Sequence, residues 1–549
     1  MNRRARGARL QGWARLGGKD LNVGSLELSD AALGRTQRNE RVATFVAVLV
    51  IVASICLCFK DLALTGLTWD EWADYGVAED YYRQQAFLTN LGDPSQSRFS
   101  HMLAALSFAI VGESYFSFKL PFVVVGLLGA VLLWWFLRRL VRPAIAALVT
   151  ALYISCPFVL SAARTAATAG DILVCVLTLA YVVTLRAWIQ NRRFWPYGFG
   201  CGVVCGLAVG AKWTCGLFLV GVVLIWLLQL WREKRSIFDG EVWTQVLAQE
   251  WVAVSLSLLA CPTLILGYPF VKDALAHSVQ FGGLAMWQFG RNRVSAPWYY
   301  IPAVLISKLS PIQLAIVLGE LLWGLFWWVR YRRRASMLSW ICLASLLPAV
   351  PLASKNFQNA QYYLVVVPAV MIASAVAAER WLRTGRTPLQ RSALGILVFA
   401  VACQLVLSIA LAPDYLLSGR QFGRLFYSQF AGPAVNHCQG QMFAIQELEE
   451  LHAAGGPGTA YVLSSCLDIY YHHRSKGPIR PRVRTMPYPS QRPSMSHYLV
   501  IPTAFQYDSL NAGDWREHLR RTTQVTQGCR PAGKGHVDYA LWFCPNKPR

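Results

Sequence analysis

Long apolar runs alternate with short polar segments along most of this chain. Each run has about 17 to 22 residues, the length that a helix needs to cross about 30 Å of hydrocarbon. The runs predict membrane-spanning helices near residues 42–60, 118–137, 144–161, 172–189, 197–212, 214–231, 252–270, 310–329, 337–353, 360–379 and 392–411. Two shorter apolar segments, 101–112 and 298–308, are either re-entrant or interfacial helices or further spans, so we expect about 11 to 13 transmembrane helices.

Composition agrees with a membrane protein. Of 549 residues 55% are hydrophobic and only 15% are charged, which is more apolar than a soluble core requires. The net charge of +23 does not indicate nucleic acid, because the basic residues form short clusters between apolar runs. These clusters fall between alternate spans, so the positive-inside rule places them in the cytoplasm together with the N-terminus. The clusters lie at 138–142, 192–193, 232–235, 330–334 and 380–386.

The pattern predicts three parts: an Arg-rich cytoplasmic tail at 1–41, a multispan domain at 42–411 with a first outer loop at 60–100, and an extracytoplasmic domain at 412–549. We expect a multi-pass protein of the cell membrane, a bacterial inner membrane by preference. The chemistry should lie on the outer side, where the long loops are.

The last part of the chain should be a small α+β domain. It contains an amphipathic helical stretch from Met442 to His452, a Gly/Pro turn from Gly455 to Gly458 and a β-like run from Ala460 to Ser464. An oxidising compartment could pair its cysteines, although the sequence does not give the pairing. These cysteines are Cys438, Cys466, Cys529 and Cys544.

An acidic cluster in the first outer loop is the first candidate for catalysis. Asp70, Glu71 and Asp74 follow the first span closely, with Glu79 and Asp80 shortly after. A carboxylate within hydrogen-bonding reach is the usual base for a hydroxyl or amine that attacks a sugar. The alternative is a solvated loop with helix-capping acids.

Basic residues at the outer ends of spans could neutralise a phosphate leaving group. The candidates are Arg98, Arg164 and Lys355, each of which could instead be an anchor at the membrane surface.

Asp171, His277 and Lys308 could position a substrate. The alternative for Asp171 is a favourable interaction with the positive end of the helix that it begins. None of the cysteines has zinc-ligand spacing, the cluster at 470–473 fits packing better than a metal site, and no cofactor is certain. Paired carboxylates could hold a divalent cation, but arginine can neutralise a phosphate without one, so metal dependence stays open.

Several motifs follow one another in the order known from one family. Their combination resembles GT-C glycosyltransferases of the protein O-mannosyltransferase and aminoarabinose transferase type over roughly residues 42 to 380. The chain departs from many relatives at Gln96–Ser100, where they carry a basic residue and two prolines. The motifs are Asp70-Glu71, the block from Leu106 to Ser114, Lys119-Leu120-Pro121, Gly126–Gly129, Ala163-Arg164 with Gly170-Asp171, Gly206–Trp213, Ala296–Tyr300 with Lys308, and Lys355 with Gln361–Leu364 and Pro368.

The resemblance implies a GT-C fold and an inverting hexosyl- or pentosyltransferase. Such an enzyme moves a sugar from a polyprenyl phosphate to an extracytoplasmic protein or glycolipid. It also implies that Asp70 is the general base, that Glu71 orients the acceptor or tunes the site, and that Arg164 contacts the carrier phosphate.

Two other classes stay open. A lipid or sugar transporter would place charged or broken helices near the bilayer midplane. A membrane-anchored binding module would work through its tail and would keep its activity without Asp70. The sequence does not reveal the sugar, the acceptor or the oligomeric state.

Overall fold

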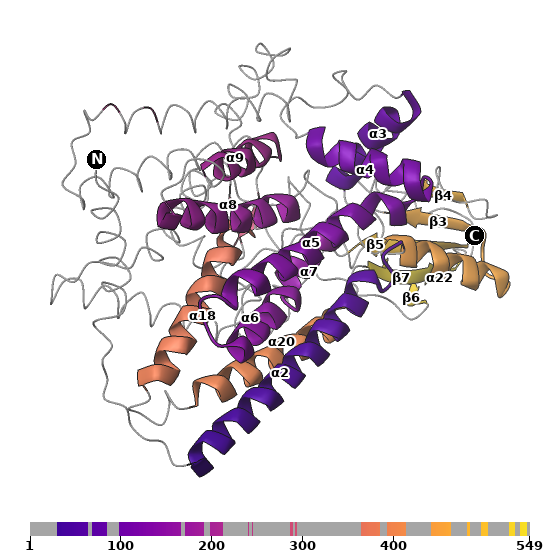
Figure 1. Cartoon of the computed structure of the whole chain (residues 1–549). Helices are drawn as coiled ribbons and strands as arrows, with labels where there is room; N and C mark the ends of the chain where they lie inside the picture. Colours follow the sequence, from indigo (N-terminus) through magenta and orange to yellow (C-terminus); the bar gives the residue numbers. More distant parts are fainter. Residues whose placement is uncertain are drawn as a thin grey trace, which may run out of the picture.

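The computed structural model of this chain describes a set of packed helices and, in the C-terminal part, a small sheet with one more helix (Figure 1). At some helix ends, including Asp70, Arg98 and Asp171, the description covers the backbone alone. The described residues are 30–63, 69–84, 98–165, 171–191, 198–211, 240, 244, 286–288, 291–293, 364–384, 392–412, 441–462, 480–483, 496–502, 526–532 and 539–545.

Ten helices of the described segments make up the membrane-embedded part and its margin. Helices α2, α5, α6 and α20 run side by side in Figure 1, and α3 and α4 lie at one end of them. The ten are α2 (Asp30–Phe59), α3 (Trp69–Gln84), α4 (Arg98–Val111), α5 (Tyr115–Leu137), α6 (Pro143–Ile154), α7 (Pro157–Arg164), α8 (Asp171–Asn191), α9 (Phe199–Ala211), α18 (Val367–Thr384) and α20 (Ala393–Leu411).

Four described helices are long and apolar enough to cross a bilayer, and a bent pair would be a fifth. They span Arg38–Phe59, Tyr115–Leu137, Leu364–Arg383 and Ala393–Ala410. These agree with the predicted spans at 42–60, 118–137, 360–379 and 392–411, although α2 starts earlier, inside the predicted cytoplasmic tail. The predicted spans at 214–231, 252–270, 310–329 and 337–353 lie outside the described residues.

The predicted single span at 144–161 is wrong in one respect, because two helices occupy it. α6 and α7 meet at an angle of 55°. Pro157 is the first residue of α7, and proline cannot donate the backbone hydrogen bond that would continue α6. The apolar run predicts the membrane segment correctly, but its average apolarity does not show that Pro157 interrupts the helix.

Side chains of α20 satisfy the backbone at this break. Gln404 Nε2 donates to the Leu152 carbonyl and, at 3.1 Å, to Ser155 Oγ, while Ser408 Oγ donates to the Ser155 carbonyl at 2.5 Å. Polar backbone groups are costly in hydrocarbon unless they are hydrogen-bonded. The break is therefore a closed joint between α6, α7 and α20.

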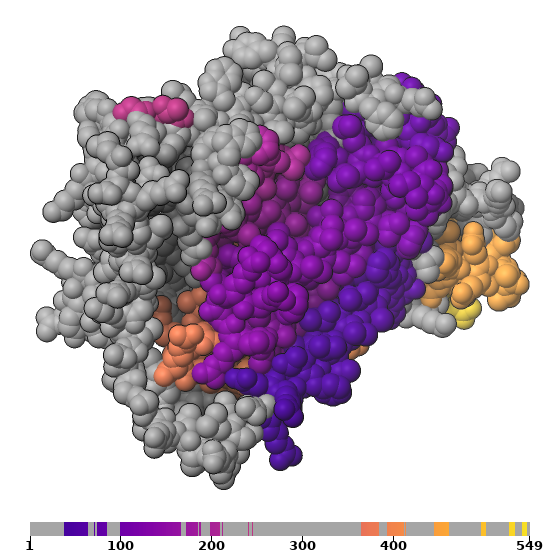
Figure 2. All heavy atoms as spheres, in the orientation of Figure 1, coloured from indigo at the N-terminus to yellow at the C-terminus, as the bar shows by residue number. Residues whose placement is uncertain are grey.

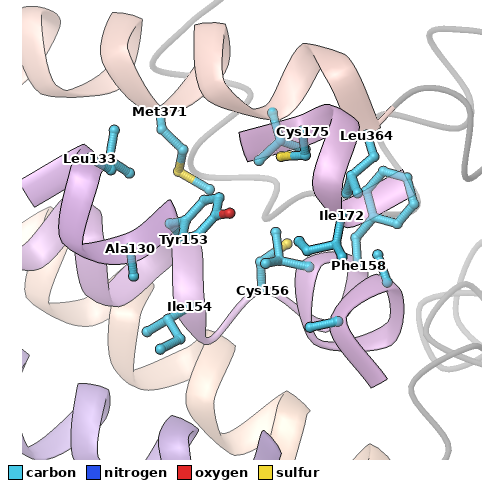
Figure 3. Packing of buried hydrophobic residues seen from close by; sticks show 14 of the residues in the cluster. Ala130, Leu133, Tyr153, Ile154, Cys156, Phe158, Ile172, Cys175, Leu364 and Met371 are labelled. Carbon is cyan, nitrogen blue, oxygen red and sulfur yellow. The ribbon is translucent and has the colours of Figure 1, made fainter. Parts of the chain in front are cut away.

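The core between α5, α6, α8 and α18 is tightly packed. Tyr153 of α6 points toward Met371 of α18, with Leu133 of α5 nearby (Figure 3). Gly129 allows this packing, because a Cβ atom there would lie 2.6 Å from Tyr153 Oη and 2.6 Å from Val176 Cγ2.

The outer surface of the bundle is apolar. Figure 2 shows indigo and violet atoms, from the first half of the chain, over a large part of one face. Among the described residues, large apolar side chains of α2 and α5 are exposed. Phe45 of α2 and Val131 of α5 are more than half exposed, at 64% and 61%. Such an apolar surface fits a lipid environment and confirms the membrane class predicted from the sequence.

Charged residues join three helices at the end of the bundle that is far from α3 and α4. Glu379 of α18 accepts a hydrogen bond from the Arg142 backbone N–H at 2.9 Å and lies 2.8 Å from Arg383 Nε. Arg142 also lies 3.2 Å from Glu40 of α2. Two of the basic clusters predicted for one side of the membrane, 138–142 and 380–386, thus meet at one end.

The C-terminal part is the small α+β domain that the sequence predicts. Helix α22 (Gln441–Ala453) and strand β3 (Thr459–Val462) coincide with the predicted helix and β-like run. The sheet order is β4-β3-β5-β7-β6, parallel from β4 to β5 and antiparallel from β5 to β6. The other strands are β4 (Arg480–Val483), β5 (His497–Pro502), β6 (Arg530–Pro531) and β7 (Tyr539–Cys544).

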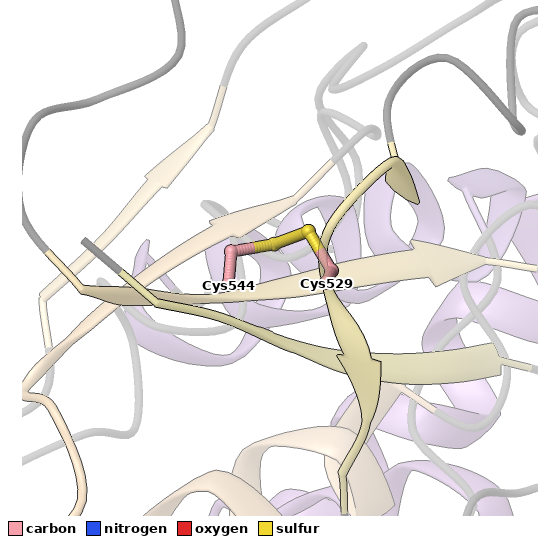
Figure 4. Close-up of a disulfide and its surroundings, with 2 residues drawn as sticks. All are labelled: Cys529 and Cys544. Atoms are coloured by element: carbon pink, nitrogen blue, oxygen red, sulfur yellow. A yellow bond between two sulfur atoms is a disulfide. The ribbon is translucent and has the colours of Figure 1, made fainter. Parts of the chain in front are cut away.

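A disulfide between Cys529 and Cys544 joins the start of β6 to the end of β7 (Figure 4). This resolves one pairing that the sequence left open, whereas Cys438 and Cys466 lie outside the described residues. A short antiparallel pair, β1 (Met286–Gln288) and β2 (Arg291–Arg293), was not predicted.

Candidate active site

The acidic cluster lies on a helix. The sequence predicts a first outer loop at 60–100, but α3 occupies residues Trp69–Gln84 of it, with Asp70 and Glu71 in its first turn. Glu71, Asp74, Tyr75 and Ala78 are all buried, with the three- and four-residue spacing of one helix face. The hydrophobic pattern does not predict this helix, because two of the residues on its buried face, Glu71 and Asp74, are acidic.

The segment 101–112, whose interpretation the sequence left open, forms helix α4. It packs against α3 and α5 and ends at Val111, and the next residue, Gly112, has a φ of 91°. Helix α5 begins immediately afterwards with a capping box, in which Ser114 and Ser117 each accept a hydrogen bond from the backbone N–H of the other. This tight turn brings α4 and the start of α5 against α3.

Glu71 pairs with Lys119, which lies in the N-terminal part of α5. Lys119 Nζ lies 3.8 Å from Glu71 Oε1, and neither side chain has exposed surface. A carboxylate and an ammonium group so deeply buried require each other, because either charge alone would be poorly solvated. In the sequence, Lys119 stands in one of the motifs shared with the glycosyltransferase family, but its partner Glu71 was not predicted.

Asp74 pairs with a histidine of α4. His101 Nε2 lies 2.8 Å from Asp74 Oδ1, and the two side chains are 6% and 3% exposed. With Asp74 ionised, Nε2 carries the hydrogen and donates it to the carboxylate. His101 was not among the predicted site residues, although a histidine in an apolar helix was a signal that could have identified it.

Arg164 is the last residue of α7 and is buried. Its Nη1 donates to the carbonyls of Leu57 and Cys58, at 2.7 and 3.0 Å. These carbonyls belong to the last turn of α2, where helical partners are lacking, so Arg164 caps α2 and holds α7 against it.

A third polar contact holds α3 through Tyr75. Its hydroxyl donates to Glu113 Oε1 at 3.2 Å, and Arg83 contacts the same carboxylate at 3.3 Å. Burial, followed by the charge of Glu113, raises the pKa of Tyr75, so the hydroxyl stays protonated. The charges of Glu79 and then Glu113 raise the pKa of the exposed Arg83.

The remaining predicted residues fall into two groups. Asp70, Arg98 and Asp171 stand in the first turns of α3, α4 and α8, and only their backbone is described. His277, Lys308 and Lys355 lie outside the described residues. Within the described part of the chain, no three His, Cys, Asp or Glu side chains are grouped so that they could hold a metal ion.

The fold and the contacts between α3, α4 and α5 define a polytopic membrane protein with buried polar pairs at one end of its helices. Residues 98–257 match the profile of the family described as dolichyl-phosphate-mannose-protein mannosyltransferase. The resemblance predicted from the sequence is thus confirmed over these residues, which include His101, Lys119 and Arg164. No match was found among curated proteins.

Solved structures were compared as well. The chain is similar to ArnT from Cupriavidus metallidurans bound to undecaprenyl phosphate, with 14% identity and a TM-score of 0.47 over 90% of this chain and 97% of that one. It is also similar to the Archaeoglobus fulgidus oligosaccharyltransferase in the apo form, with 13% identity and a TM-score of 0.44 over 81% of this chain and 62% of that one.

Proposed function

We propose that this protein is an inverting membrane glycosyltransferase. It transfers a sugar from a polyprenyl phosphate to a protein or glycolipid acceptor outside the cytoplasm. The observation that carries the proposal is the acidic first part of α3, where Glu71 and Asp74 are buried against Lys119 and His101. Two of these partners belong to the segment that matches the mannosyltransferase family.

The reaction needs one carboxylate to accept a proton. The acceptor oxygen or nitrogen attacks the anomeric carbon from the face opposite the phosphate, a carboxylate takes its proton, and the carbon–oxygen bond to the phosphate breaks. Asp70 is our candidate for this base. Lys119 already compensates the charge of Glu71, and Glu71 has no exposed surface, so Glu71 fits better as a residue that tunes the site from beneath it.

The leaving group is a polyprenyl phosphate, which requires positive charge. We assign this role to Arg98, Arg164 and Lys355. For Arg164 the contribution is the charge of a guanidinium group whose Nη1 is held by α2. Asp171, His277 and Lys308 are assigned to substrate positioning.

The proposed orientation has the N-terminus in the cytoplasm and α3 on the outer side. Two observations support it. The basic clusters at 138–142 and 380–386 gather at the opposite end of the bundle, where the positive-inside rule expects them. The Cys529–Cys544 disulfide suits an oxidising compartment such as a bacterial periplasm.

The transporter alternative receives less support. A broken helix within the membrane is typical of transport sites when its free carbonyls are left to bind ions. At the break between α6 and α7, Gln404 and Ser408 of α20 occupy the carbonyls of Leu152 and Ser155 instead.

Release of polyprenyl phosphate tests the proposal. Purified protein is reconstituted in vesicles with undecaprenyl-phosphate hexoses and aminopentoses labelled in the lipid, and native membranes supply acceptors. We expect Asp70→Asn to lose most of the release rate. Asp80→Asn, at an exposed position of the same helix, should retain it. Equal rates for wild type and Asp70→Asn would contradict Asp70 as the base.

A further inference from the structure

The buried pair of Asp74 and His101 has no part in the chemistry described so far. Its hydrogen bond of 2.8 Å joins α3 to α4 in a place that water barely reaches. Two apolar side chains of similar size would fill that space without the cost of burying a carboxylate. A hydrogen bond, unlike an apolar contact, also restricts the relative orientation of the two side chains and of the helices that carry them.

We propose that His101 is a positioning residue of the proposed transferase: by holding Asp74 it sets the rotation of the first turns of α3 and thereby the placement of Asp70. This inference rests on the proposed function. Asp70 precedes Asp74 by one helical turn, about 6 Å along the axis. Any rotation of α3 at Asp74 therefore moves the backbone of Asp70 as well.

The apolar contacts of α3 do not fix this rotation alone. Tyr75 packs by its edges against Phe108 and Phe118, with ring centroids 5.3 and 5.2 Å away. Such contacts tolerate small shifts of α3, because edge-to-face aromatic pairs are favourable over centroid distances of about 4.5 to 7 Å. His101 of α4 is hydrogen-bonded to Asp74, and Lys119 of α5 pairs with Glu71. These two polar contacts with different helices together fix the rotation of α3.

The test compares variants in the vesicle assay, with kcat, the KM for labelled undecaprenyl-phosphate sugar and the thermal unfolding midpoint measured for each. His101→Gln keeps an amide donor at a reach similar to Nε2, whereas His101→Asn is polar but too short, and His101→Leu has no donor. Tyr75→Phe is the matched control, since it removes the next hydrogen bond of α3, to Glu113.

We expect His101→Leu and His101→Asn to lower kcat by at least about tenfold with KM within about twofold, because displacing a reacting group by about 1 Å can cost about 100-fold. His101→Gln should recover most of the rate. Tyr75→Phe should lower the unfolding midpoint and leave kcat near wild type.

Three results would overturn the inference: an unchanged kcat in His101→Asn, a loss confined to KM, or an equal loss of kcat in Tyr75→Phe. If His101→Leu does not fold, the comparison of His101→Asn with His101→Gln decides. The proposed function fails separately, when wild type releases no polyprenyl phosphate or Asp70→Asn is as active as wild type.

Discussion

Lys119 Nζ lies 3.8 Å from Glu71 Oε1, and neither side chain has any exposed surface. The pair joins the first turn of α3, where the candidate base Asp70 stands, to the N-terminal part of α5, a helix long enough to span a membrane. A buried pair contributes little over apolar residues but is costly to break. It therefore ties the placement of the acidic turn to the integrity of the helix bundle.

Lys119→Met should leave the Glu71 carboxylate buried without this counter-charge. We expect the free energy of unfolding in detergent to fall by about 3 to 5 kcal/mol. The double variant Lys119→Met with Glu71→Gln should recover most of that loss, since no charge remains buried. A single variant as stable as wild type would show that the pair is solvated in the membrane.

Gln404→Leu should destabilise the joint between α6 and α7. The variant removes the donor to the Leu152 carbonyl and to Ser155 Oγ, and an unsatisfied buried group costs about 1 to 3 kcal/mol. Cys403→Ala, at the exposed neighbouring position, is the control and should be neutral. Equal unfolding midpoints for the two variants would mean that the break does not depend on Gln404.

Gly129→Ala should weaken the contact of α5 with α6 and α8. The added Cβ would meet Tyr153 Oη and Val176 Cγ2 at 2.6 Å, so atoms must shift, at a cost of about 1 to 3 kcal/mol. Gly395→Ala in α20 meets nothing within 4 Å and should be neutral or stabilising by about 0.5 to 1 kcal/mol. Thermal unfolding of both variants checks the difference, and a reversed order would contradict this packing.

The Cys529–Cys544 disulfide should be detectable in protein prepared from membranes. Alkylation of the denatured protein without a reductant should label the free Cys56 and Cys403, whereas Cys529 and Cys544 should react only after reduction. Peptide mass spectrometry distinguishes the two states. Ready alkylation of Cys529 before reduction would remove this support for an extracytoplasmic tail.

The sequence predicted the coarse architecture well, for physical reasons. A span is set by the length of an apolar run, so α2, α5, α18 and α20 appear close to where the hydrophobic pattern puts them. Helix α22 and strand β3 have local signals of the same kind. The bend between α6 and α7 was missed because average apolarity does not register a single proline.

The site was predicted less completely, because its partners are distant in the chain. Asp70 and Glu71 could be selected from local composition, but pairing Glu71 with Lys119 requires knowing that α3 folds back onto α5. The same holds for Asp74 and His101, which are separated by 27 positions. Arg164 was selected as a phosphate contact. Its hydrogen bonds to the carbonyls of Leu57 and Cys58 were not predicted, because these residues lie 107 and 106 positions before it in the chain.

The most direct test of the central claim uses a donor with one label in the sugar and another in the lipid. Vesicles containing the protein are supplied with this donor and with native membranes on the outer side. We predict that each released polyprenyl phosphate is matched by one labelled sugar on an acceptor, and that Asp70→Asn abolishes both. If the two labels instead cross the bilayer together on an intact donor, the protein is a transporter and the glycosyltransferase account is wrong.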